Sequence, residues 1–118
     1  MPENPDPPSM PVKETAIVFE QMEWQSPQPG VRCKVFRKGR TQIRLVEFAQ
    51  EFVEPDWCIR GHAGLVLSGV LEVDFTGEVV RYAEGTALHI PAGAAHAHKA
   101  RAVTPTVTLF LVEEAGEG

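Results

Sequence analysis

The stretch Gly85-Thr-Ala-Leu-His-Ile-Pro-Ala-Gly-Ala-Ala-His-Ala-His98 decides the fold of this chain. Its first half predicts an apolar strand. That strand must stop at Pro91, because proline has no N–H to offer a sheet ladder. Gly93 then supplies the permissive backbone that a tight corner needs. The stretch therefore predicts a strand, a corner and a second strand, the pattern of an antiparallel β protein.

The second strand is predicted over 95–99 and carries His96 and His98. Residues two apart in an extended strand point to the same face of a sheet. The two imidazoles are therefore expected to point in the same direction, which is the interior if the sheet closes here. Together they form a candidate metal or acid–base site.

Short apolar segments recur along the rest of the chain and are separated by glycine and proline. A spacing of about 8–12 residues between such segments indicates an all-β sandwich or barrel. The predicted strands cover 15–19, 31–36, 41–49, 62–67, 70–75, 79–82, 87–90, 95–99 and 106–112, with a loop over 26–30.

The spacing Gly85-x5-Pro91-x-Gly93-x2-His96 resembles the second motif of the cupin superfamily, whose members are small double-sheet β-barrels. The family's first motif, His-x-His and then a Glu seven residues before a hairpin glycine, is matched in form upstream of Gly69. Its Glu position holds His62, and its two His positions hold Asp56 and Cys58. The resemblance spans 43–112. It implies an all-β, single-domain cupin β-barrel, a jelly-roll-like pair of antiparallel sheets.

The domain boundaries follow from composition and from this resemblance. A chain of 118 residues fits one domain, since domains are commonest at about 100–150 residues. Residues 1–11 contain five prolines and are predicted to be a flexible lead-in. Residues 12–113 are predicted to form the barrel, and residues 114–118 an acidic tail. Because an unpaired sheet edge is a liability, a homodimer is expected.

Composition limits the classes of binding partner and the cellular location that are expected. Eleven basic and sixteen acidic residues give a net charge of −5, which disfavours a nucleic-acid partner. No segment approaches the roughly 20 apolar residues that span a bilayer, so no membrane partner is expected. The two cysteines do not form a secreted disulfide framework, and no signal peptide is visible. A cytoplasmic protein with a small-molecule ligand is expected.

The resemblance places Cys58, His62 and His96 at three positions where cupins bind a divalent metal. One thiolate with two imidazoles favours Zn²⁺, with Ni²⁺, Cu or Fe as alternatives. His98 is either a fourth ligand or a hydrogen-bonding residue of the lumen. Asp56 is either a ligand, a carboxylate that orients an imidazole, or a solvated turn residue. The structural alternative is that Cys58 is a buried small residue and His62 a hydrogen-bonded wall residue.

The leading functional hypothesis is a cupin that binds a divalent metal, a small molecule or both inside the barrel. A metal-dependent enzyme is one version of it, and whether the chain is an enzyme stays open. The first alternative is a metal-free binding or sensor module. The second is metal-free proton transfer of the sugar isomerase or epimerase kind, with His62 or His96 as the base. No carboxylate is clearly placed in the sequence to orient that base.

Four cations, Arg32, Lys34, Arg44 and Arg60, lie on or beside the predicted strands. Their side chains are expected on solvated faces. The alternative is that they reach the mouth of the cavity and hold an anionic ligand.

Overall fold

The computed structural model describes residues 12–114, which form strands and short 3-10 helices. The 3-10 helices are η1 (Val12–Thr15), η2 (Phe19–Gln21) and η3 (Ala94–His96). The strands are β1 (Gln25–Gln28), β2 (Val31–Lys38), β3 (Thr41–Ala49), β4 (His62–Ser68), β5 (Leu71–Phe75), β6 (Glu78–Tyr82), β7 (Ala87–Ile90), β8 (Lys99–Ala102) and β9 (Thr106–Glu114). The predicted all-β class is confirmed.

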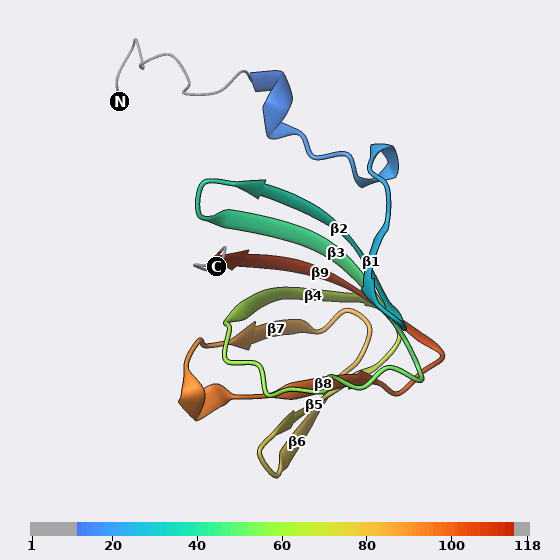
Figure 1. The fold of residues 1–118 in the computed structure, drawn as a ribbon, viewed down its shortest axis with the longest axis vertical. Coiled ribbons are helices and arrows are strands. Elements are labelled where there is room, and N and C mark those ends of the chain that lie inside the picture. The colour runs from blue at the N-terminus through green and yellow to red at the C-terminus, as the bar shows by residue number, and fades with distance from the viewer. Residues whose placement is uncertain (1–11, 115–118) are drawn as a thin grey trace.

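The strands form two antiparallel sheets, a larger one drawn above a smaller one in Figure 1. The large sheet has the order β1-β2-β3-β9-β4-β7, and the small sheet has the order β6-β5-β8. The last strand, β9, lies between β3 and β4 and pairs with both of them. This pairing places the end of the chain beside the middle of the sequence, which matters for the site described below.

The hydrophobic core lies between the two sheets, because alternate residues of each strand point toward the other sheet. Val46, Val66, Val73 and Val107 are at most 1% exposed. Burying one such side chain contributes about 1.5–3 kcal/mol. The same alternation brings the polar residues of β3 and β9 into the interior toward one end of these strands.

A close approach between β4 and β9 depends on Gly64. A Cβ added to Gly64 would lie 1.9 Å from the carbonyl oxygen of Phe110. Any side chain there would force the two strands apart, since real Cβ atoms do not approach so closely. The glycine therefore allows the β4–β9 pairing that carries His62 and Glu113.

Two predictions about the N-terminal region are wrong. The segment 15–19, predicted as a strand, contains the end of η1 and the start of η2. A β-branched run needs a partner strand, and β1 takes the edge position beside β2. The segment 26–30, predicted as a loop, contributes most of β1. Its Pro27 is tolerated because β1 is an edge strand, and the N–H groups on its outer edge have no neighbouring strand to bond.

The prediction of a strand over 95–99 is also wrong for its first part. Gly93 has φ 117° and leads into the 3-10 turn η3, in which the His96 N–H donates to the Gly93 carbonyl at 3.1 Å. Strand β8 begins only at Lys99. The two-residue alternation that was expected to align His96 with His98 is therefore absent.

The ends of the chain lie mostly outside the described residues. The predicted flexible lead-in, 1–11, and residues 115–118 of the predicted acidic tail fall there, whereas Glu114 is the last residue of β9. Among the residues that the structure describes, none of the helices is long and apolar enough to cross a bilayer.

Candidate functional site

Three side chains of metal-binding type meet between the sheets. Cys58, His62 and His98 each offer one ligand atom, and these atoms lie within 4.8 Å of one another. Cys58 Sγ is 3.6 Å from His62 Nε2, and the rings of His62 and His98 have centroids 5.1 Å apart. The thiol and the imidazoles can therefore contact one common atom or molecule.

Backbone pairing brings these three residues together. Cys58 lies in the long connection between β3 and β4, and it forms an isolated bridge with His98. In that bridge each N–H donates to the other residue's carbonyl, at 2.8 and 2.9 Å. His62 follows as the first residue of β4. The site thus joins two segments that are far apart in the sequence.

His96 and Asp56 do not belong to this group. His96 is exposed at the end of η3, and the third position is taken by His98, which is 2% exposed. The physical reason is the η3 turn, which rotates His96 away from the direction of a regular strand. Asp56 is exposed in the connection between β3 and β4. The predicted set therefore changes from Cys58, His62 and His96 to Cys58, His62 and His98.

Both imidazoles are anchored through Nδ1. The His62 Nδ1 contacts Oε2 of Glu113, and the His98 Nδ1 contacts the His96 carbonyl at 2.9 Å. A carboxylate or carbonyl on Nδ1 places a proton there, so Nε2 is the ring nitrogen left to contact Cys58 or to bind a metal. His96 thus supports the site through its backbone and not through its side chain.

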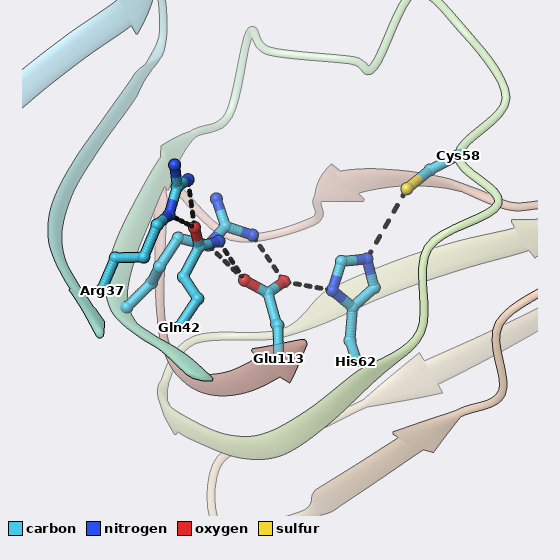
Figure 2. A network of polar contacts seen from close by, with 6 residues as sticks. Arg37, Gln42, Cys58, His62 and Glu113 are labelled. Carbon is cyan, nitrogen blue, oxygen red and sulfur yellow. Dashed lines mark hydrogen bonds and ion pairs between the residues drawn. The ribbon is translucent and has the colours of Figure 1, made fainter. Parts of the chain in front are cut away.

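Glu113 is the centre of a polar chain that runs from Arg37 to Cys58, drawn in Figure 2. Arg44 donates to both oxygens of Glu113, at 2.7 and 2.8 Å, and the Gln42 amide donates at 2.9 Å. Arg37 in turn donates to the Gln42 side-chain oxygen, from Nε at 2.9 Å. The bidentate pair with Arg44 holds the carboxylate in one orientation, so the direction of the His62 ring is set as well.

These contacts shift the pKa values of the groups in the chain. Hydrogen bonds from His62 and His98 lower the pKa of the Cys58 thiol from 9.0 to about 5. Burial opposes the charged form of His62, but Cys58 and Glu113 outweigh it and raise the His62 pKa to about 9. Burial also opposes ionisation of Glu113, yet His62 and Arg44 hold its pKa at about 2. In the metal-free protein near neutral pH, the thiol is therefore ionised and His62 is protonated.

Comparison with known proteins agrees with this architecture. A search of curated proteins finds no match to the sequence, but residues 59–112 match the family described as Cupin domain. The fold resembles KdgF from Halomonas sp., with 25% identity, a TM-score of 0.69, and coverage of 85% of this chain and 93% of that one. The chain belongs to the cupin superfamily.

Two further cupin structures share the fold at lower identity. One is a sugar phosphate isomerase from Silicibacter pomeroyi, with 14% identity, a TM-score of 0.69, and coverage of 86% of this chain and 76% of that one. The other is an RmlC-like cupin from Shewanella frigidimarina, with 13% identity, a TM-score of 0.67, and coverage of 86% and 90%. The predicted recognition of the family is confirmed by these matches.

This cupin holds a cavity of about 320 Å³ between its sheets, and the Cys58, His62 and His98 group lies in its wall. The volume is at the small end of ligand pockets, which span about 300–1,000 Å³. The polar part of the wall also includes Arg60 and Glu54. The apolar part is formed by core side chains, among them Val31, Val46, Phe52, Leu71, Val73, Leu88 and Leu109.

Sequence reasoning missed Glu113 and misplaced Arg44. No motif position marks Glu113, and the leading prediction places Arg44 on a solvated face, whereas both residues line the cavity. The alternation of β9 held the missing signal, because Val107, Leu109 and Leu111 are buried and Glu113 continues the same face. On β3, Arg44 similarly shares its inward face with Val46.

Proposed function

We propose that this cupin binds a divalent cation through Cys58, His62 and His98 and holds a small molecule in the adjoining cavity. One observation carries the proposal: two imidazoles with engaged Nδ1 atoms stand beside a thiol, with all three ligand atoms within 4.8 Å of one another. Metal-binding histidines in proteins characteristically have their other ring nitrogen engaged in this way.

The donor set fits Zn²⁺ best. Thiolate and neutral imidazole are the ligands that Zn²⁺ prefers, whereas Mg²⁺ and Ca²⁺ prefer oxygen. The environment already favours the ionised form of Cys58, because its pKa is about 5. A cation would also displace the proton that His62 shares with this thiol. Ni²⁺, Cu and Fe remain alternatives that metal analysis separates.

Three protein donors are typical of catalytic zinc sites, and four of structural ones. Bound there, the metal would supply Lewis acidity toward an oxygen of the ligand. The chain's own residues provide the rest: Glu113 and Arg44 fix the His62 ring, and the His96 carbonyl fixes the His98 ring. The apolar side chains limit the water that surrounds a ligand in the cavity.

Metal analysis and thermal shifts test the proposal. Protein purified without a nickel column should contain a stoichiometric metal, and Zn²⁺ should raise the melting temperature of the metal-free form. The alanine variant His98→Ala should abolish this shift, whereas His96→Ala should retain it, because only the former removes a ligand atom. An unchanged melt of the wild-type chain with Zn²⁺, or equal behaviour of the two variants, would refute the proposed site.

A second candidate is metal-free proton transfer, which the Glu113–His62–Cys58 alignment favours. Here the Cys58 thiolate would accept a proton and the His62 imidazolium would donate one, with Glu113 holding the ring. Metal-free protein in D₂O would then incorporate deuterium beside the carbonyl of fructose 6-phosphate as a probe. Incorporation that survives His62→Gln would remove this candidate.

The homodimer and the cytoplasmic location stay predictions. Support for the dimer comes from Leu65, Leu67 and Val112, which are 37%, 44% and 41% exposed on the outer face of the large sheet. Neighbouring exposed apolar side chains often mark an interface. Analytical ultracentrifugation tests the dimer, and a monomer at micromolar concentration would contradict it.

A further inference from the structure

Arg60 lies between two of the three site residues in the sequence and lines the same cavity. Cys58, Arg60 and His62 all contribute to the cavity wall, whereas the intervening Ile59 and Gly61 do not. This is the alternation of an extended segment, with every second side chain turned inward. Arg60 is also exposed to solvent, so its guanidinium lies at the mouth of the cavity.

Arg60 is unusual among the arginines of this protein, all of which lie within the described residues. The other arginines each donate a hydrogen bond to a carboxylate or amide side chain, and for Arg60 the structure records none. The bonded arginines are Arg32, Arg37, Arg40, Arg44, Arg81 and Arg101. A guanidinium at a cavity mouth without a side-chain partner keeps its donors available for a ligand.

The two acidic side chains of the cavity wall are bonded to other groups and not to Arg60. Glu113 is engaged by Arg44 and His62. Glu54 is the remaining acidic side chain in the wall, and its Oε1 accepts from the Ala100 N–H at 2.9 Å. Burial raises the pKa of Glu54, because the cavity wall disfavours its charged form. Neither carboxylate of the cavity wall is therefore hydrogen-bonded to Arg60, and its guanidinium can contact an anionic ligand.

We propose that Arg60 binds the anionic group of a small organic acid, a carboxylate or a phosphate, whose body lies in the cavity between the sheets. The planar guanidinium matches two oxygens of either anion in a bidentate geometry. The apolar wall formed by residues such as Phe52, Leu88 and Leu109 would contact the rest of the molecule. This inference deepens the proposed function by naming its ligand class, and it rests on that proposal only in using the same cavity.

Calorimetric titration with three probes tests the inference. Mandelate carries a carboxylate, phenyl phosphate carries a phosphate, and mandelamide is the uncharged counterpart of mandelate. Wild-type protein should bind at least one anion about tenfold more tightly than mandelamide, the difference expected for one charge-assisted hydrogen-bonded contact. The Arg60→Gln variant should lose this preference. The tighter of the two anions identifies carboxylate or phosphate as the natural group.

Arg81→Gln is the matched control. It removes the same charge from β6, outside the cavity wall, and leaves Glu72 paired with Arg101. The control should keep the preference for the anion, and both variants should melt close to the wild-type temperature. Equal binding of the anions and mandelamide, no binding of either anion, or an equal loss in both variants would overturn the inference.

The failure of this inference is separable from the failure of the proposed metal site. The titrations are run on EDTA-treated and on Zn²⁺-loaded protein, and the Zn²⁺ thermal shift of Arg60→Gln is measured alongside. An Arg60-dependent preference without any Zn²⁺ shift would leave the anion site standing and remove the metal. A normal Zn²⁺ shift without an Arg60-dependent preference would leave the metal site standing and remove the anion site.

Discussion

The substitution Glu113→Gln should lower the free energy of unfolding by an amount that depends on pH. Glu113 is buried and bonded to Arg44 and His62, and its pKa falls from 4.5 to about 2. At about 1.4 kcal/mol per pH unit, this shift corresponds to about 3 kcal/mol of stability near neutral pH. The Arg44 side chain is 25% exposed, and solvent screening reduces the expected loss to about 2 kcal/mol.

The sign of the pH dependence follows from the direction of this shift. Because the pKa of Glu113 is lower in the folded than in the unfolded chain, its ionisation stabilises the fold above pH 4.5, and this stabilisation is lost as the pH falls toward 2. A protonated Glu113 resembles glutamine. The difference between wild type and Glu113→Gln should therefore be largest near neutral pH and vanish at the acidic end.

Urea unfolding of metal-free protein, followed by circular dichroism across this pH range, measures that difference. Glu114→Gln is the control, because the pair between Glu114 and Arg40 is 65% and 79% exposed and should contribute at most about 0.5 kcal/mol. The electrostatic role of the carboxylate is refuted by either of two results. One is that Glu113→Gln has the same free energy of unfolding as the wild type near neutral pH, and the other is that its free energy of unfolding is lower by the same amount at every pH.

Two further predictions concern the strand pairing and the thiol. Gly64→Ala should destabilise the protein by more than about 2 kcal/mol in a urea melt, because its Cβ would lie 1.9 Å from a backbone oxygen; Ala63→Ser, on the exposed face of the same strand, should have little effect. In metal-free protein, iodoacetamide should alkylate Cys58 with a rate that rises through a pH of about 5, and Zn²⁺ should protect it. Mass spectrometry should find Cys33, which is 5% exposed, unmodified; an unreactive Cys58 at neutral pH, or a rate that rises only near pH 9, would contradict the assigned pKa.

Much of the sheet could be predicted from local sequence signals. The strands predicted over 31–36 and 41–49 are confirmed as β2 and β3, which pair in register from Val31↔Phe48 to Lys38↔Thr41. The end of β7 at Ile90 follows from Pro91. These signals are reliable because they act between near neighbours, through backbone donors and side-chain direction.

The candidate site was predicted only in part. Cys58 and His62 were identified because the family's first motif fixes their spacing from the hairpin at Gly69. The sequence points to His96 because this residue occupies the histidine position of the family's second motif. In the structure His96 ends the η3 turn and is exposed, and His98 lies beside Cys58 and His62 instead. A single turn of 3-10 helix changes which side chain faces inward, and the alternating pattern of the sequence does not indicate that turn.

By itself, the sequence determines that this chain is all-β, because glycines, prolines and alternating apolar residues act over a few positions each. The spacing of its two motifs adds the resemblance to cupins. Only the tertiary structure decides that Glu113, at the end of the last strand, orients His62 at the start of β4. That contact depends on the pairing of β9 with both β3 and β4, and the register of strands so distant in sequence is set by the packing of the whole sheet. The chemistry of the thiol at position 58 is thus a property of the assembled sheets.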